Sequence, residues 1–108
     1  MGFGRWFPLD QAAVHAPAGP GVYQVRLAHG LVAYPTGRSA MIRYGATDDL
    51  RAAVAELARA YAGREWLCRF ADPAADGMDA RTRSPDDLLA ELMTAFHRRF
   101  GAPPGLPE

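Results

Sequence analysis

Apolar and polar residues alternate along three stretches of the chain, and this alternation predicts the strands of a sheet. Residues 21–27 place tyrosine, valine and leucine on one side and a more polar set on the other, which is typical of a half-buried strand. Residues 40–45 and 66–71 predict a second and a third strand. Between the first two strands, residues 31–34 extend a hairpin and residues 35–39 form a turn.

Apolar residues that recur every three or four positions predict two longer helices. The first covers residues 50–61, with Thr47 as its N-cap and Gly63 as its stop. The second begins after Ser84, which precedes a proline and two aspartates, and it ends at Gly101. Each helix therefore has one apolar side to bury against a sheet.

Residues 1–15 form an aromatic segment that we expect to pack against the body of the domain. Within it, Asp10 is expected to cap a short helical turn over residues 11–15. Residues 72–83 are polar and predict an exposed loop. The order strand, strand, helix, strand, helix predicts an α+β fold, a small three-stranded antiparallel sheet flanked by helices. We expect one domain of 108 residues with its core in residues 16–103.

The composition is that of a soluble globular protein, with 49% hydrophobic and 22% charged residues. The 12 basic and 12 acidic residues cancel, which excludes the strongly basic field of a nucleic-acid coat and argues against a membrane partner. Cys68 is the only cysteine, so an internal disulfide and a cysteine metal cluster are excluded. The chain shows neither a signal pattern nor a long apolar run, and we expect a cytoplasmic protein.

Three short motifs occur at the strand and helix boundaries predicted above. Pro-Gly-Val-Tyr at residues 20–23 opens the first strand, Ile-Arg-Tyr-Gly at 42–45 closes the second, and Asp-Asp-Leu-Arg at 48–51 begins the helix. The stretch at 91–103 looks like the last helix and tail of small bacterial proteins of the same kind. Together these motifs resemble the GIY-YIG nuclease superfamily, over residues 16–103, and they imply a GIY-YIG-like fold.

The resemblance implies hydrolysis of nucleic-acid phosphodiester bonds. In that family a first-strand tyrosine helps to activate water, a second-strand tyrosine orders the site, and a helix arginine binds the phosphate. Tyr23 matches the first tyrosine directly. Counting back from Gly45, the second tyrosine position falls on Arg43, with Tyr44 one place late. A shift of one residue in a regular strand turns a side chain to the opposite face.

The helix arginine and the metal-binding acid of the family are matched less directly. The expected arginine position is Ala53, and Arg51 lies two residues earlier, about 200° around the helix. The resemblance also implies a glutamate that holds one divalent metal ion. Glu91, Asp86 and Asp87 all lie in the right region, and the choice among them stays open. Helix N-terminal electrostatics also explain the two aspartates, and the polar edge of a helix explains Glu91.

The arginines of the sheet suggest a contact of another kind. Arg26 and Arg43 share one face if the strands pair in the right register, and Arg38 lies in the loop between them. These three residues are a candidate basic patch for nucleic acid despite the zero net charge. Surface arginines paired with nearby acids are the simpler explanation. For Trp6 and the other aromatic residues, core or interface packing is a simpler expectation than a platform for stacking bases.

Two functional hypotheses follow. The first is a GIY-YIG-like domain without nuclease activity and without a cofactor, which acts as a binding or interaction module for nucleic acid or forms a homodimer. The alternative is a divergent endonuclease in which Tyr23, Arg43, Tyr44 and Arg51 act in catalysis and Glu91 holds Mg²⁺ or Mn²⁺. The alternative predicts that these groups converge on one concave surface.

Overall fold

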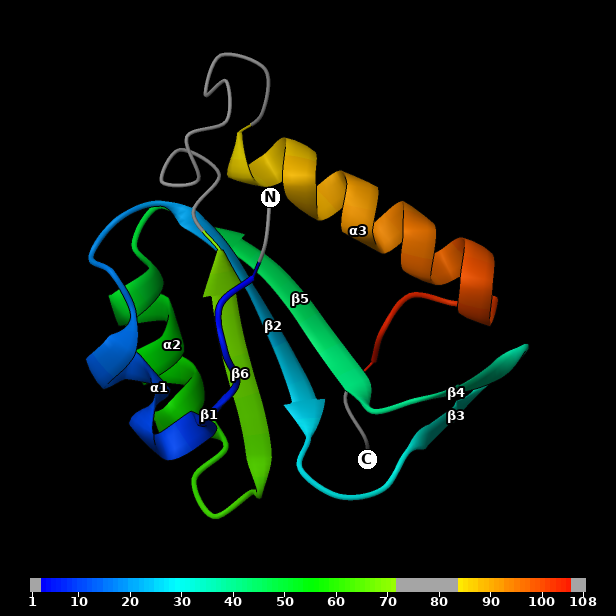
Figure 1. Ribbon diagram of the computed structural model, residues 1–108, viewed down its shortest axis with the longest axis horizontal. Helices are drawn as coiled ribbons and strands as arrows, with labels where there is room; N and C mark the ends of the chain where they lie inside the picture. The colour runs from blue at the N-terminus through cyan, green and yellow to red at the C-terminus, as the bar shows by residue number, and fades with distance from the viewer. Residues whose placement is uncertain (1–2, 72–83, 106–108) are drawn as a thin grey trace.

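The structure, a computed structural model, describes residues 3–71 and 84–105 (Figure 1). Within these residues the fold is α+β, with a four-stranded antiparallel sheet, a separate two-stranded ribbon and three helices. The elements in chain order are β1 (Phe7–Pro8), α1 (Leu9–His15), β2 (Gly21–Leu27), β3 (Val32–Tyr34), β4 (Gly37–Ser39), β5 (Met41–Thr47), α2 (Leu50–Ala60), β6 (Trp66–Ala71) and α3 (Pro85–Phe100). The three predicted strands and both long helices are confirmed, with bounds that differ by at most two residues.

The central strand of the sheet is β2, which pairs with β5 on one side and with β6 on the other. β1 adds a short fourth strand along β6, with Phe7 opposite Cys68. The predicted sheet of three strands was therefore one strand short, because two residues are too few to show an alternation pattern. Residues 37–39, predicted as part of a turn, form β4 instead, since the chain reverses just before them and pairs β4 with β3.

Helices α1 and α2 cover one face of the sheet (Figure 1). Alternate residues of β2 point to this face, and Tyr23 and Val25 belong to the core that the two helices close. Leu50 and Val54 of α2 are fully buried in the same core. The apolar stripe predicted for this helix is therefore the side that packs on the sheet.

Helix α3 packs on the opposite face, over β5 and β2. Gln24 of β2 lies on this face and pairs with Tyr44 of β5. The Tyr44 ring meets Phe96 of α3 edge-on, with 5.8 Å between ring centroids. Phe96 also meets Tyr34 of the ribbon at 5.0 Å. A second, smaller apolar layer thus holds α3 to the sheet and to the ribbon.

The helix starts differ in part from the prediction. α2 is capped by Asp49, whose carboxylate accepts a hydrogen bond of 3.2 Å from a backbone amide of the first turn. Thr47 ends β5 instead, and its hydroxyl accepts a hydrogen bond from the Asp49 amide. α1 begins at the buried Leu9, with Pro8 at its N-cap, so Asp10 lies inside the first turn and does not cap it.

Helix α3 begins and ends as predicted. Ser84 and Asp87 form a capping box, each side chain accepting a hydrogen bond from the other residue's backbone amide. Gly101 ends the helix in the left-handed conformation, with φ at 81°.

The N-terminal segment lies against the sheet. The Phe7 ring stacks on His15 of α1 at 4.2 Å and on Phe70 of β6 at 5.8 Å. The loop predicted at 72–83 lies outside the described residues. No helix in the described part of the chain is long and apolar enough to cross a membrane.

Candidate functional site

Tyr23 and Arg43 meet on the face of the sheet that α2 covers. Tyr23 pairs with Gly45 across β2 and β5, and Arg43 pairs with Val25, so both side chains point to the same side. The Arg43 Nε donates a hydrogen bond of 3.3 Å to the Tyr23 hydroxyl. Arg43 therefore stands next to the tyrosine hydroxyl at the position where the resemblance expects a second tyrosine.

Gly45 explains how the Tyr23 ring comes to lie in this direction. A Cβ built on Gly45 would collide with the Cζ and hydroxyl of Tyr23 and would come within 2.6 Å of its Cε2. The ring lies flat across the glycine of the paired strand. The missing side chain thus provides the space that brings the hydroxyl to Arg43.

A shallow depression of about 340 Å³ opens beside this pair. Its lining residues come from the sheet, from α2 and from the turn after α2: Tyr23, Arg43, Ala53, Glu56, Leu57, Ala60 and Tyr61. Ala53 lies where the resemblance expects the phosphate-binding arginine, so the helix supplies no guanidinium here. Arg43, which the strand supplies, is the cation of the depression. Arg43 forms no ion pair among the described residues. The carboxylate residue Glu56 is part of the lining of the same depression.

Tyr44 lies on the other face of the sheet. Its ring packs against Phe96 of α3, as described above. Burial raises the pKa of Tyr44, the nearby Arg69 guanidinium lowers it by a smaller amount, and Tyr34 raises it further. The Tyr44 side chain lies on the side of the sheet opposite Tyr23, because Tyr44 pairs with Gln24.

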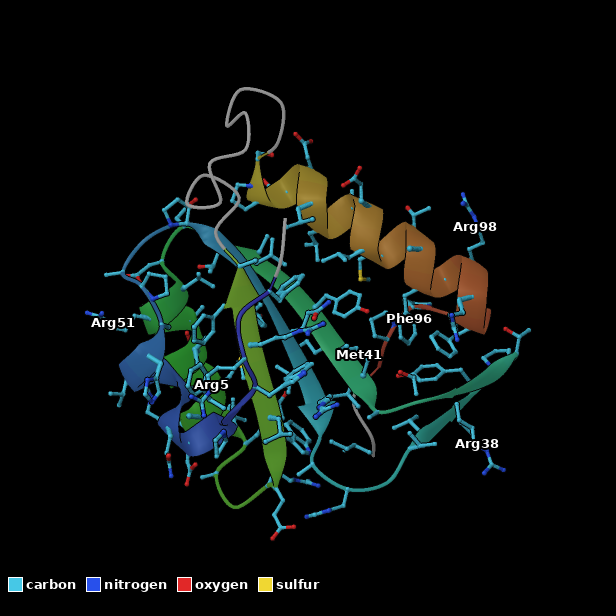
Figure 2. All side chains as sticks on the ribbon, in the orientation of Figure 1. Arg5, Arg38, Met41, Arg51, Phe96 and Arg98 are labelled. Carbon is cyan, nitrogen blue, oxygen red and sulfur yellow. The ribbon has the colours of Figure 1, made fainter. Side chains whose placement is uncertain are left out.

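Arg51 is also separate from the depression. Its Nε donates a hydrogen bond of 3.0 Å to the Ala16 carbonyl, and its backbone amide donates one of 3.2 Å to the Pro17 carbonyl. These bonds tie the start of α2 to the segment after α1. Figure 2 shows the Arg51 side chain at the outer edge of the molecule. Its contacts are those of a structural link between the two helices.

The acidic candidates Asp86, Asp87 and Glu91 all belong to α3, which packs on the face opposite Tyr23. Asp87 caps the helix, and Asp86 lies in the first turn, where the helix dipole favours a negative charge. Glu91 is exposed. In residues 3–71 and 84–105 no group of three or more His, Cys, Asp or Glu side chains is placed to hold a metal ion. The donor set that the resemblance implies does not fit a metal ion beside the Tyr23 hydroxyl.

The three arginines of the candidate basic patch are separated. Arg43 lies on the α2 face, whereas Arg26 points to the α3 face beyond a bulge that shifts the register after Val25. Arg38 lies on β4 and points outward into solvent (Figure 2). The register of β2 and β5 thus does not bring Arg26 and Arg43 to one face.

Arg26 has a different neighbour, Arg69 of β6. The guanidinium carbons of both residues lie 4.5 Å from the centre of a Trp6 ring. Arg69 Nε also donates a hydrogen bond of 2.6 Å to Oε1 of the buried Gln24. Burial lowers the pKa of Arg69, Tyr44 raises it, and the like charge of Arg26 lowers it further. We name Trp6, Arg26 and Arg69 the arginine–tryptophan cluster.

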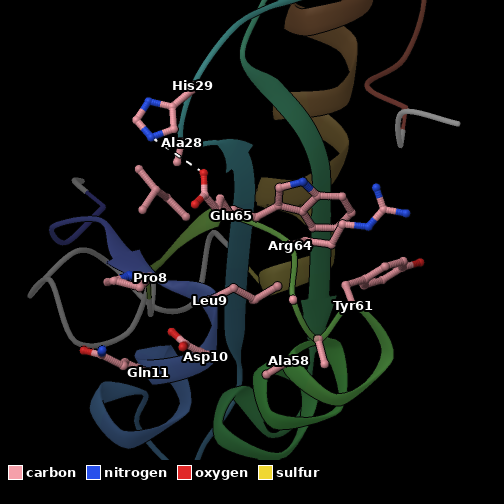
Figure 3. Close-up of a pocket in the computed structure, with 14 residues that line it drawn as sticks. Pro8, Leu9, Asp10, Gln11, Ala28, His29, Ala58, Tyr61, Arg64 and Glu65 are labelled. Atoms are coloured by element: carbon pink, nitrogen blue, oxygen red, sulfur yellow. Dashed lines mark ion pairs between the residues drawn. The ribbon is translucent and has the colours of Figure 1, made fainter.

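A second depression, of about 430 Å³, lies at the far end of the sheet between the start of α1 and the start of β6 (Figure 3). Leu9 and Trp66 form part of its apolar wall, and Asp10 and Glu65 are acidic groups at its edge. His29 and Glu65 approach to 3.9 Å, but both side chains are more than 80% exposed. So exposed a pair contributes little binding energy. This depression contains none of the residues that the sequence predicted for a site.

Comparison with known proteins adds no assignment: no family model, no curated protein and no solved structure matches the chain. The functional conclusions below therefore depend on the chain's own residues and on their geometry.

One residue of the arginine–tryptophan cluster, Arg69, lacked a clear sequence signal. Arg69 follows Cys68 in a strand and carries no motif, and its contact with Trp6 joins positions far apart in the chain. The alternation of residues 66–71 does show that Arg69 and Cys68 point to opposite faces. Only the pairing of β6 with β2, which puts Arg69 opposite Gln24, brings it near Arg26.

Proposed function

We propose that the protein is a GIY-YIG-like nucleic-acid-binding module that holds a phosphate group at the Tyr23–Arg43 depression without hydrolysing it. The observation that carries this proposal is the division of the candidate catalytic residues between the two faces of the sheet. Tyr23 and Arg43 meet, whereas Tyr44 and the acids of α3 lie across the sheet and Arg51 is tied to the segment after α1.

The chemistry of the pair suits an oxyanion. A guanidinium has five N–H donors, and Arg43 uses its Nε toward Tyr23, which leaves both terminal nitrogens for a bidentate contact with phosphate oxygens. The Tyr23 hydroxyl accepts from Arg43 and keeps its own proton to donate to the same phosphate. The Arg43 guanidinium and the Tyr23 hydroxyl therefore donate to the same phosphate group from two different directions.

Hydrolysis needs more than these donors. Attack on a phosphodiester requires an activated oxygen nucleophile and additional positive charge at the transition state. The described residues bring neither a carboxylate set for a metal ion nor a second cation to the depression. Binding without cleavage is the function that this geometry supports best.

The decisive experiment measures binding of fluorescein-labelled single- and double-stranded oligonucleotides at about 50 and about 200 mM salt. We expect binding that weakens as salt rises. Arg43→Ala removes the charge-assisted hydrogen bonds and is expected to lower affinity about tenfold. Glu56→Gln removes a negative charge from the same wall and is expected to raise affinity. Arg59→Ala, an exposed arginine of α2 outside the depression, is the matched control and is expected to change little.

The same preparations incubated with plasmid and with Mg²⁺ or Mn²⁺ test the endonuclease alternative. The contact between Arg43 and the Tyr23 hydroxyl is the observation in its favour, because it places a cation beside the hydroxyl that the resemblance links to the activation of water. Intact plasmid is the result expected of a binding module. Metal-dependent cleavage that is abolished by Tyr23→Phe would replace our proposal with the nuclease. Absence of nucleic-acid binding at low salt would reject both.

A further inference from the structure

The arginine–tryptophan cluster lies on the α3 face of the sheet, on strands β2 and β6. Arg26 and Arg69 are diagonal neighbours there, since Arg69 pairs with Gln24 and Arg26 pairs with Leu67. Trp6 reaches them from the N-terminal segment. The ring centroid of Phe3, in the same segment, lies 4.9 Å from the guanidinium carbon of Arg69. Rings and guanidinium groups thus alternate over neighbouring strands.

The positive charge of the cluster has no acidic partner among the residues that the structure describes. Neither Arg26 nor Arg69 forms an ion pair in residues 3–71 and 84–105. Arg69 donates to the neutral Gln24 amide, and the Arg26 Nε is buried without a hydrogen-bond partner. Burial is the main cause of the lowered pKa of Arg69, and the like charge of Arg26 lowers this pKa further. Two neighbouring cations that have no carboxylate partner in the described part of the chain favour an anionic ligand.

Among the described residues, α3 has its main sheet contacts with β5 and β2, and β6 lies on the far side of β2 from β5. α1 and α2 close one face, and α3 packs over β5 and β2 on the other. Over Arg69 the described contacts come from the N-terminal segment, through Trp6 and Phe3. Figure 2 shows side chains lying across the sheet between this segment and β5. Trp6, Arg26 and Arg69 are each partly exposed, so a ligand has access to them.

We infer that the arginine–tryptophan cluster binds single-stranded nucleic acid. Phosphate groups pair with the guanidinium groups of Arg26 and Arg69, and an unpaired base stacks on the Trp6 ring. Grooves that bind single strands combine cationic side chains with aromatic rings in this way, and stacking tolerates any base because each base has a π face. A duplex keeps its bases inside the stack, so it offers the cluster phosphates only.

This surface is independent of the Tyr23–Arg43 depression. Arg26 and Arg69 lie on one face of the sheet, and Tyr23 and Arg43 lie on the other. A variant of one surface therefore leaves the other intact. Loss of binding in Arg43→Ala alone would assign the ligand to the depression, whereas loss in Arg26→Ala alone would assign it to the cluster.

The test titrates the full chain with a short oligothymidine and follows tryptophan fluorescence. The chain has two tryptophans, and Trp66 is only 6% exposed, so stacking of a base affects the emission of Trp6 first. We expect the oligonucleotide to quench the emission of the unmodified protein and to leave that of Trp6→Phe nearly unchanged. Oligouridine in a parallel titration distinguishes RNA from DNA as the source of the single strand.

Arginine variants locate the binding surface by fluorescence anisotropy of the labelled strand. Arg26→Ala and Arg69→Ala are each expected to weaken binding about tenfold and to reduce its dependence on salt. Arg59→Ala, an exposed arginine outside both surfaces, is the matched control and is expected to keep full affinity. Arg69 also bonds Gln24, so circular dichroism accompanies each variant. If Arg69→Ala does not fold, Arg26→Ala and Trp6→Phe decide the question.

Three results would overturn the inference. Unchanged Trp6 emission with saturating oligonucleotide would mean that the cluster only anchors the N-terminal segment. Equal quenching by heparin, a polyanion without bases, would make the surface a general anion site. A duplex that binds as tightly as the single strand would remove the role of base stacking. Quenching by the single strand with loss of affinity in Arg26→Ala would establish the inference.

Discussion

The Tyr23 ring fills the space that any side chain at position 45 would occupy. Gly45 on the neighbouring strand has no side chain, and the contact between the Tyr23 hydroxyl and Arg43 depends on the space that this leaves. At Trp6 the side chain is large instead of missing, and its ring system contacts two arginines that come from different strands. At both places the size of a neighbouring residue determines which groups a side chain contacts.

Gly45→Ala is expected to destabilise the fold by about 1–3 kcal/mol, since the added methyl group forces the Tyr23 ring to move within a packed core. Urea unfolding followed by circular dichroism measures this change. In a Tyr23→Ala background the same substitution meets no ring and should cost clearly less. Equal costs in the two backgrounds would show that the collision does not determine the choice of glycine.

The helices and strands follow local signals to different extents. Ser84, Pro85 and Gly101 mark both ends of α3, and the sequence shows these marks directly. Residues 37–39 become a strand only because they fold back on β3, and the bulge after Val25 depends on how β2 and β5 pair. Strand pairing is a long-range property, which explains why the elements were predictable and the register was not.

Ser84→Ala is expected to lower the free energy of unfolding by about 1 kcal/mol, because the capping box loses the side chain that accepts from the Asp87 amide. Thermal unfolding monitored at a helical wavelength measures the effect. Thr94→Ala, an exposed change in the middle of α3, is the control and should not lower stability. A similar loss in both variants would contradict a specific role for the cap.

In the whole molecule, the Tyr23–Arg43 depression and the arginine–tryptophan cluster lie on opposite faces of one sheet. The family resemblance pointed to Tyr23 and Arg43 as candidates, and the expected pairing of the strands pointed to Arg26. It could not show which of them meet, because this depends on the register and on contacts such as that of Trp6 with Arg69. The sequence thus named these candidates, and it did not show which surfaces they form.

The buried Cys68 gives the whole fold a pH dependence. Burial raises the pKa of this thiol from 9.0 to about 12, so the folded state holds the proton more tightly than the unfolded state. This stabilisation is fully present below about pH 9 and is lost as the pH rises toward about 12. The partly buried Tyr44, whose pKa is also raised, acts in the same direction.

The urea midpoint is therefore expected to fall steadily when the pH is raised above about 9. Cys68→Ala removes the titrating thiol and should show a shallower decline over the same range. Native protein should also react slowly with a thiol reagent at about pH 8 and rapidly once unfolded. Rapid labelling of the native chain would contradict the burial of this thiol.

Strand β2 sends successive side chains to opposite surfaces, with Tyr23 on one and Gln24 and Arg26 on the other. One short strand thus carries residues of the Tyr23–Arg43 depression and of the arginine–tryptophan cluster on opposite faces of the sheet. Selection can remodel either area by changing every second codon, while the backbone ladder that both share stays as it is. Substitutions can therefore accumulate on one face while the side chains on the reverse stay the same.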